Sequence, residues 1–244
     1  MKLHIYKDRQ ELAHELAKWI SDLVDSTLQT QEFFTLALSG GETPQALFKT
    51  LASAEFKNKI NWKRIHIFWG DERAVSYNDD RNNAKVAHDL LIDHIDIPAE
   101  QVHVMRTDIE PVFAAKAYEK LLHGYFDNTV KSFDLVLLGL GGDGHTLSIF
   151  PGAPLSEGEE QNWVNAVYNI EQHMYRITLT PAIVNRASDI AFMVSGSDKA
   201  DILKEVIEGS NTHPVLPAQL IKPENNELHW FLDKDSAKKL SKTG

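Results

Sequence analysis

Apolar and polar positions along the chain follow two periods, one typical of helices and one typical of buried strands. Residues 8–28 place apolar side chains three or four positions apart, which predicts an amphipathic helix. Short apolar runs such as 33–39, 64–71 and 133–141 are rich in β-forming residues and predict buried strands. Such segments alternate through most of the chain, which predicts an α/β fold with an open, mostly parallel sheet flanked by helices.

The predicted helices are residues 8–28, 45–52, 82–94, 111–126, 198–208 and 235–240. The predicted strands are residues 33–39, 64–71, 101–105, 133–141, 163–168, 176–181, 189–196 and 228–232. No linker, repeat or low-complexity segment interrupts them, so residues 1–244 are predicted to form a single domain.

Composition narrows the class of protein. Hydrophobic residues make up 43% of the chain, enough for a sizeable core, yet no apolar run approaches the roughly 20 residues that span a bilayer. The start, MKLHIYKDRQ, is charged where a signal peptide needs an apolar segment. The absence of cysteine excludes disulfides, thiolate nucleophiles and iron–sulfur clusters. We therefore expect a cytoplasmic protein.

The charge balance restricts the partners. Acidic residues outnumber basic ones 35 to 25, which gives a formal net charge of −10. Such a surface disfavours binding to nucleic acid or to an anionic membrane, so neither is expected as a partner. It also repels an anionic metabolite at long range, so a phosphorylated substrate requires a local cluster of cations and hydrogen-bond donors.

Three polar, glycine-containing segments follow predicted strands. They are SGGETP (39–44), GDER (70–73) and GGDGH (141–145). In open parallel sheets, ligands bind beyond the carboxyl ends of the strands. We therefore expect the three segments to meet in one pocket.

The first segment has the composition of an anion-binding turn. It reads Ser39-Gly40-Gly41-Glu42-Thr43-Pro44. Glycines allow the backbone to approach a ligand closely, and Thr43 as N-cap with Pro44 in the first turn predicts a helix start whose free N–H groups attract an anion. The alternative is an ordinary strand-to-helix turn. Arg73, Arg176 and Lys199 lie at predicted strand ends or helix starts and could complete a phosphate site, or could be solvated surface charges.

The third segment carries the residues for chemistry. A nearly continuous apolar strand delivers Asp143 and His145 into a glycine-permitted turn. A neutral imidazole can take a proton from water near neutral pH, and Asp143, or Asp71 across the pocket, could orient it or hold the water. Arg73 could stabilise an oxyanion. A surface histidine near an acid is the alternative reading.

Three other readings are weaker. Gly139, Gly141 and Gly144 match GxGxxG, but Pro151 and Pro154 interrupt the chain where a dinucleotide-binding fold needs a long helix. Ser148 does not lie in a GxSxG nucleophile elbow. The eleven histidines form no HxxxH or HExxH pair, so neither a metal nor another cofactor is expected.

Taken together, four ordered motifs resemble the glucosamine-6-phosphate isomerase/6-phosphogluconolactonase family. They are SGGETP (39–44), GDERAV with Asn82 and Asn83 (70–83), GLGGDGHTLSIFPG (139–152) and RITLT (176–180). The resemblance implies a Rossmann-like sheet. For the lactonase branch it also implies hydrolysis of a small phosphorylated sugar lactone, 6-phospho-D-glucono-1,5-lactone, to 6-phospho-D-gluconate in the oxidative pentose phosphate pathway, without a cofactor. It also implies His145 as general base assisted by Asp143, and Arg73, Arg176 and Lys199 near substrate. A monomer or homodimer is expected.

The sequence departs from the family pattern at three positions. Glu42 stands where Ser or Thr is common, Ser76 where proline is usual and Leu147 where a small residue is usual. These departures concern affinity more than the class of reaction.

Two rival functions stay open. Amino-sugar-phosphate deaminases share the glycine loop and DGH but continue to a glutamate, whereas Phe150 occupies that position here. A non-catalytic sugar-phosphate sensor would ordinarily require a DNA-binding module, for which the residues before 39 leave no room.

Overall fold

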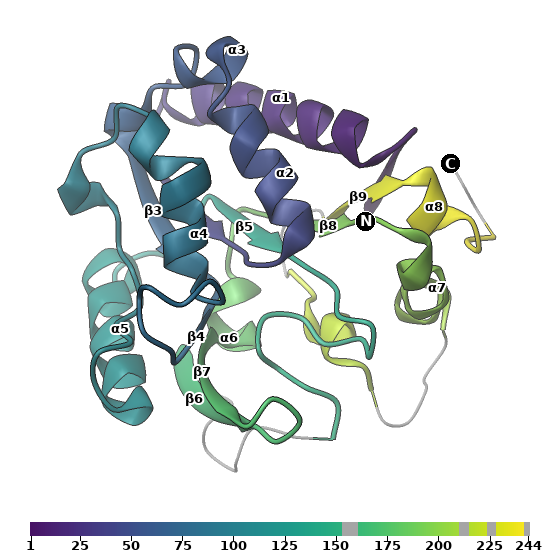
Figure 1. The fold of residues 1–244 in the computed structure, drawn as a ribbon. Helices are drawn as coiled ribbons and strands as arrows, with labels where there is room; N and C mark the ends of the chain where they lie inside the picture. Colours follow the sequence, from purple (N-terminus) through teal and green to yellow (C-terminus); the bar gives the residue numbers. More distant parts are fainter. Residues whose placement is uncertain (153–160, 210–214, 224–227, 242–244) are drawn as a thin grey trace.

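A six-stranded parallel sheet forms the centre of the computed structural model, which describes residues 1–152, 161–209, 215–223 and 228–241. Pro154 lies outside the described residues. The strand order is β1-β9-β8-β5-β2-β3, and every neighbouring pair is parallel. Helices lie against this sheet, with α1 packed on β1 and β9 and α2 packed on β8 (Figure 1). The predicted open, mostly parallel sheet flanked by helices is confirmed.

The strands are β1 (Lys2–Tyr6), β2 (Phe34–Leu38), β3 (Ile65–Trp69), β4 (Asp71–Arg73), β5 (Leu135–Leu138), β6 (Val164–Asn169), β7 (Met174–Leu179), β8 (Asp189–Val194) and β9 (Leu228–Asp233). The helices are α1 (Arg9–Thr27), α2 (Glu42–Leu51), α3 (Ala54–Lys57), α4 (Asn83–Leu90), α5 (Pro111–Phe126), α6 (Pro181–Val184), α7 (Ala200–Glu208) and α8 (Lys234–Ala237).

A second sheet corrects the prediction of one strand over residues 64–71. The chain leaves the parallel sheet after Trp69, and β4 pairs instead with β7 in a three-stranded antiparallel sheet ordered β4-β7-β6. Gly70 joins the two sheets, because its N–H donates to the Leu38 carbonyl at 2.8 Å and its carbonyl accepts from the Leu179 N–H at 2.8 Å. Apolar periodicity alone does not reveal such a change of sheet, because both halves of the run are buried.

Several predicted bounds change. Residues 101–105 do not form a strand and contribute only an isolated bridge between Val102 and Ile67. The helix predicted over 82–94 ends at Leu90, after which a 3₁₀ turn follows. The edge strand β1 was not predicted, since it is short and none of its residues is fully buried.

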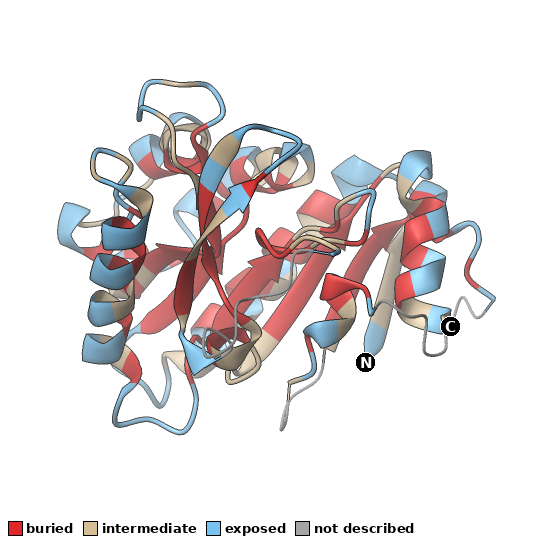
Figure 2. Cartoon of the chain, turned by 90° about the horizontal axis from the view of Figure 1, so that it is seen from below, coloured by how far each residue is buried: buried red, intermediate tan, exposed pale blue. Residues whose placement is uncertain are grey.

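The core follows the central strands. All four residues of β5 and all five of β2 are buried. Figure 2 shows that buried residues run through the strands in the interior of the molecule. At the start of this pair, the Asp134 carboxylate accepts hydrogen bonds from the Thr35 N–H and hydroxyl, both at 2.8 Å. These buried bonds fix the register of β5 against β2, and with it the point at which each strand reaches the edge of the sheet. The core also includes Ile177 and Leu179 of the second sheet, so the two sheets share one hydrophobic core. The single domain over residues 1–244 stays a prediction from the sequence.

Two observations bear on the alternatives weighed from the sequence. The segment after Gly144 forms turns through Gly152 rather than a helix, which removes the dinucleotide-binding reading of GxGxxG. Within the described part of the chain, none of the helices is both long and apolar enough to cross a membrane.

Helix α1 begins at a side-chain cap. The Asp8 carboxylate accepts hydrogen bonds from the Gln10 and Glu11 N–H groups, both at 3.0 Å. We expect Asp8→Ala to lower the free energy of unfolding by about 1 kcal/mol, the usual cost of losing an N-cap. Asp25→Ala, an exposed change on the same helix, should stay within about 0.5 kcal/mol of the parent. Urea unfolding measures both, and an equal loss in the two variants would contradict the capping role.

Candidate active site

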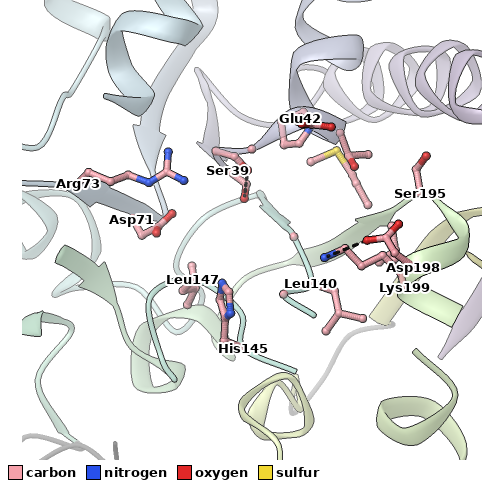
Figure 3. A pocket seen from close by; sticks show the side chains of 18 of the residues that line it. Ser39, Glu42, Asp71, Arg73, Leu140, His145, Leu147, Ser195, Asp198 and Lys199 are labelled. Carbon is pink, nitrogen blue, oxygen red and sulfur yellow. Dashed lines mark hydrogen bonds and ion pairs between the residues drawn. The ribbon is translucent and has the colours of Figure 1, made fainter. Parts of the chain in front are cut away.

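A cleft of about 440 Å³ opens where the chain leaves β2, β3, β5 and β8. The three glycine-containing segments meet there as expected from the parallel topology. Ten predicted site residues line the cleft: Ser39, Gly40, Gly41, Glu42, Thr43, Asp71, Arg73, His145, Arg176 and Lys199. In Figure 3, Asp71 and Arg73 lie on one side, Lys199 lies on the other and His145 lies between them.

His145 is held by a tightly bonded turn. The imidazole Nδ1 lies 2.5 Å from Asp143 Oδ1, which also accepts the His145 backbone N–H at 3.0 Å. With Nδ1–H as the donor, Nε2 of the neutral ring is free to accept a proton. Asp143 does not line the cleft and reaches it through His145. Partial burial by itself raises the pKa of Asp143, but the hydrogen bonds and charge of His145 outweigh it and lower that pKa below its usual value.

Two glycines make this turn possible. A Cβ on Gly141 would lie 2.0 Å from His145 Nδ1, so the ring occupies the space that any other residue would fill. Gly144 has a φ of +85°, in the left-handed region that favours glycine. The sequence GGDGH therefore folds the imidazole back over its own strand end.

Asp71 and Arg176 form a buried pair on the other side of the cleft. The Arg176 guanidinium Nη1 lies 3.7 Å from Asp71 Oδ2, and both side chains are less than 10% exposed. Burial lowers the pKa of Arg176 from its ordinary value, and the Asp71 carboxylate opposes this. Across the antiparallel pair, Arg176 lies opposite Arg73.

These two arginines have spare donors. Among the groups that the structure describes, Nε of Arg73 and Nε of Arg176 are buried without a hydrogen-bond partner. Unpaired buried donors are costly, and the two guanidinium groups that carry them both line the cleft.

Glu72 is a structural residue rather than a solvated loop acid. It is fully buried, and its carboxylate accepts the N–H groups of Arg73, Asn83 and Ala84 at 2.7, 2.7 and 2.8 Å. Burial raises the pKa of Glu72 to about 7, against the opposing effect of these bonds. The bonds close the connection from β4 to α4 and keep Arg73 beside the cleft.

The glycine loop, residues 39–44, leads into helix α2, and the N-cap of this helix is not the predicted one. Helix α2 begins at Glu42, the N-cap is Gly41 with a φ of +106°, and no side chain caps the helix, so Thr43 is not the N-cap. The N–H groups of the first turn consequently have no side-chain acceptor at the mouth of the cleft, which suits an anion better than a capped turn does. Glu42 has a side chain 85% exposed and lies 3.7 Å from Arg9 Nη1.

Four polar lining residues were not predicted: Arg9, Gln172, Ser195 and Asp198. Arg9 donates from Nε to Ser195 Oγ at 2.9 Å, and Arg176 donates to the Gln172 side chain. Arg9 is the first residue of α1 and lies three positions after the end of the unpredicted strand β1. Recognition of β1 would therefore have made Arg9 a candidate under the rule that places ligands at strand ends. No group of three or more His, Asp or Glu side chains suited to a metal ion occurs in the described ranges.

Comparisons with known proteins point to one family. The family model described as glucosamine-6-phosphate isomerases/6-phosphogluconolactonase matches residues 7–230. The chain belongs to this family. Among its relatives, a 6-phosphogluconolactonase of Haemophilus influenzae is 40% identical and covers 84% of this chain and 87% of its own. A 6-phosphogluconolactonase of Nostoc is 35% identical and covers 98% of each chain.

Solved structures of the family have the same fold. The structure of 6-phosphogluconolactonase from Trypanosoma brucei superposes with a TM-score of 0.84 at 26% identity and covers 98% of each chain. A monomeric glucosamine-6-phosphate deaminase superposes with a TM-score of 0.81 at 18% identity, a likeness of fold alone. The fold is therefore shared by both branches of the family and does not distinguish their reactions.

The glycine loop yields a test of packing. A Cβ on Gly40 would lie 2.0 Å from Asn83 Oδ1, and Asn83 in turn donates to the Asp71 carbonyl at 2.9 Å. We expect Gly40→Ala to lower the free energy of unfolding by about 1–3 kcal/mol through overpacking. Gly124 lies in α5, and a Cβ there would meet no other atom within 4 Å. Gly124→Ala should therefore leave the free energy of unfolding unchanged or raise it by up to about 1 kcal/mol. Thermal unfolding checks both, and an unchanged Gly40→Ala variant would contradict the close contact.

Proposed function

We propose that this chain hydrolyses 6-phospho-D-glucono-1,5-lactone to 6-phospho-D-gluconate, the lactonase step of the oxidative pentose phosphate pathway. One observation carries the assignment: a histidine oriented by a carboxylate faces a cleft that several cations line. The 6-phosphogluconolactonases among its relatives cover 84–98% of the chain, which supports the same reaction here.

In the proposed reaction, His145 is the general base. Nε2 takes a proton from a water molecule, whose oxygen attacks C1 of the lactone. The bond between C1 and the ring oxygen then breaks, and the proton on Nε2 passes to the leaving alkoxide. Asp143 stabilises the imidazolium that forms in between, because its low pKa keeps it ionised at neutral pH.

The other charged groups of the cleft stabilise the oxyanion, place the attacking water and bind the phosphate. Arg73 supports the oxyanion that develops at C1, and Asp71 helps to place the attacking water. The free N–H groups of the glycine loop, Arg176 and Lys199 bind the 6-phosphate, with Arg9 as a further cation at the same cleft. Together these four cations provide the local attraction that the acidic surface as a whole lacks.

The chain lacks the glutamate that an amino-sugar-phosphate deaminase uses in ring opening. Phe150 occupies the position at which that branch carries a glutamate, and its ring packs on His145 with centroids 4.8 Å apart. A phenyl ring cannot exchange a proton during ring opening, so the lactonase reaction is the better match.

The decisive experiment follows acid release from freshly generated 6-phosphogluconolactone above its spontaneous hydrolysis, with glucosamine-6-phosphate tested in parallel. We expect acceleration with the lactone alone. His145→Ala should lower kcat by about 10²- to 10⁴-fold, the usual contribution of general-base catalysis, with the fold checked by circular dichroism. Ammonia release from the amino sugar would establish the deaminase function. No activity on either substrate would favour the non-catalytic sugar-phosphate sensor.

Lys199 tests the phosphate end of the cleft. Its ammonium lies 3.9 Å from Asp198 Oδ2, and its side chain is 25% exposed. We expect Lys199→Ala to raise KM by roughly 10- to 100-fold with a smaller change in kcat, because a charged hydrogen bond to phosphate is lost. Lys204→Ala, on the exposed face of α7, is the matched control and should leave both constants unchanged. Equal KM values for the two variants would remove Lys199 from the phosphate site.

The cytoplasmic location and the monomeric or homodimeric state stay predictions from the sequence. One relative in Arabidopsis is named a chloroplastic 6-phosphogluconolactonase.

A further inference from the structure

Ser148 has a buried hydroxyl that bonds to the opposite wall of the cleft. Its Oγ donates to Asp71 Oδ2 at 2.6 Å, and the residue is 1% exposed. Asp71 Oδ2 is the same oxygen that faces Arg176 at 3.7 Å. The sequence indicates that Ser148 is not a nucleophile, and the structure agrees, since its hydroxyl donates to the Asp71 carboxylate rather than to the His145 imidazole.

The bond depends on an unusual backbone turn. Leu147 has a φ of +56°, a left-handed conformation that costs a residue with a side chain free energy. This turn reverses the chain directly after His145 and Thr146. Across the turn, Thr146 forms an isolated antiparallel bridge with Ile149. The reversal is what directs Ser148 toward the second sheet.

A second bond holds the same residue to that sheet. The Ser148 N–H donates to Thr178 Oγ1 at 3.1 Å, and Thr178 lies directly opposite Asp71 in the pairing of β4 with β7. At the other end of the turn, Thr146 Oγ1 donates to the Gly139 carbonyl at 2.9 Å, next to the end of β5. The loop that carries His145 is therefore fastened to the parallel sheet before the turn and to the antiparallel sheet after it.

Side-chain packing reinforces the same arrangement. Leu147 is 8% exposed and lines the cleft, and a Cβ on Gly70 would lie 2.8 Å from its Cδ2. Figure 3 shows Leu147 beside His145 on the side of Asp71. Gly70 is the residue at which the chain passes from one sheet to the other. The Leu147 side chain packs against Gly70 at this junction.

We propose that Ser148 is a positioning residue, which sets the orientation of the Asp71 carboxylate and its spacing from His145. The inference rests on the proposed lactonase function and adds to it a residue that touches no substrate. Ser148 uses Oδ2 of Asp71 and thereby fixes how the carboxylate faces the water that His145 deprotonates. Loss of the hydroxyl would leave Asp71 free to rotate toward Arg176.

The test compares two buried serines. Ser148→Ala removes the bond to Asp71, whereas Ser236→Ala removes an equally buried hydroxyl that bonds to the Val194 and Asp233 carbonyls, both at 3.0 Å, and does not line the cleft. We expect similar losses of Tm in the two variants. Only Ser148→Ala should lower kcat, by roughly 10- to 100-fold with KM within about twofold, since small displacements of a catalytic group have effects of this size.

A double-mutant cycle shows whether Ser148 acts through Asp71. In the Asp71→Asn background, Ser148→Ala should lower kcat by less than about threefold, because the carboxylate that it orients is already gone. Multiplicative losses, or a Ser148→Ala variant with the kcat of Ser236→Ala, would overturn the proposal. A parent protein without lactonase activity would instead refute the proposed function, so the two failures are distinguishable.

Discussion

The parallel pairing of the central strands is the constraint on which the site depends. Each strand of a parallel sheet ends at the same edge, so the loops after β2, β5 and β8 are brought together although they are far apart in the sequence. The buried bonds between Asp134 and Thr35 fix where β5 stands relative to β2. The position of His145 relative to the glycine loop (residues 39–44) follows from that register.

The antiparallel sheet supplies the other wall. Gly70 is hydrogen-bonded to both sheets, and immediately after it the chain presents Asp71 and Arg73 to the cleft from β4. Arg176 reaches the same wall from β7, as the cross-strand neighbour of Arg73. One side of the cleft is thus a set of loops at strand ends, and the other is a rigid pair of strands. A charged pair such as Asp71 and Arg176 can be buried there because the strands hold both side chains in place.

Electrostatics in this protein act at two scales. The formal charge of −10 describes the whole molecule, whereas Arg9, Arg73, Arg176 and Lys199 line a single cleft. Screening limits the long-range repulsion to about 8–10 Å at physiological salt, so the local cations dominate once a phosphorylated ligand has entered. Glu42, the departure from the family pattern, lies near Arg9 at the exposed rim, where its charge costs little.

The sequence by itself determined the class of fold, the order of most strands and helices, and the segments that form the cleft. Apolar periodicity predicted α1 within one residue at either end and α5 over its full length, because one face of each helix is buried and the other is solvated. The glycines of SGG and GGDGH and the ordered motifs identified the family. These features are local, since each depends on neighbouring residues in the chain.

Only the tertiary structure decided the features that depend on distant partners. The division of residues 64–71 between two sheets at Gly70 required the whole fold. The burial of Glu72 against the first N–H groups of α4 required it as well. So did the entry of Arg9 into the cleft and the bond from Ser148 to Asp71, which joins residues 77 positions apart. A side chain of Ser, Glu or Arg suits a surface as well as a site, and its role is set by the groups that long-range packing places beside it.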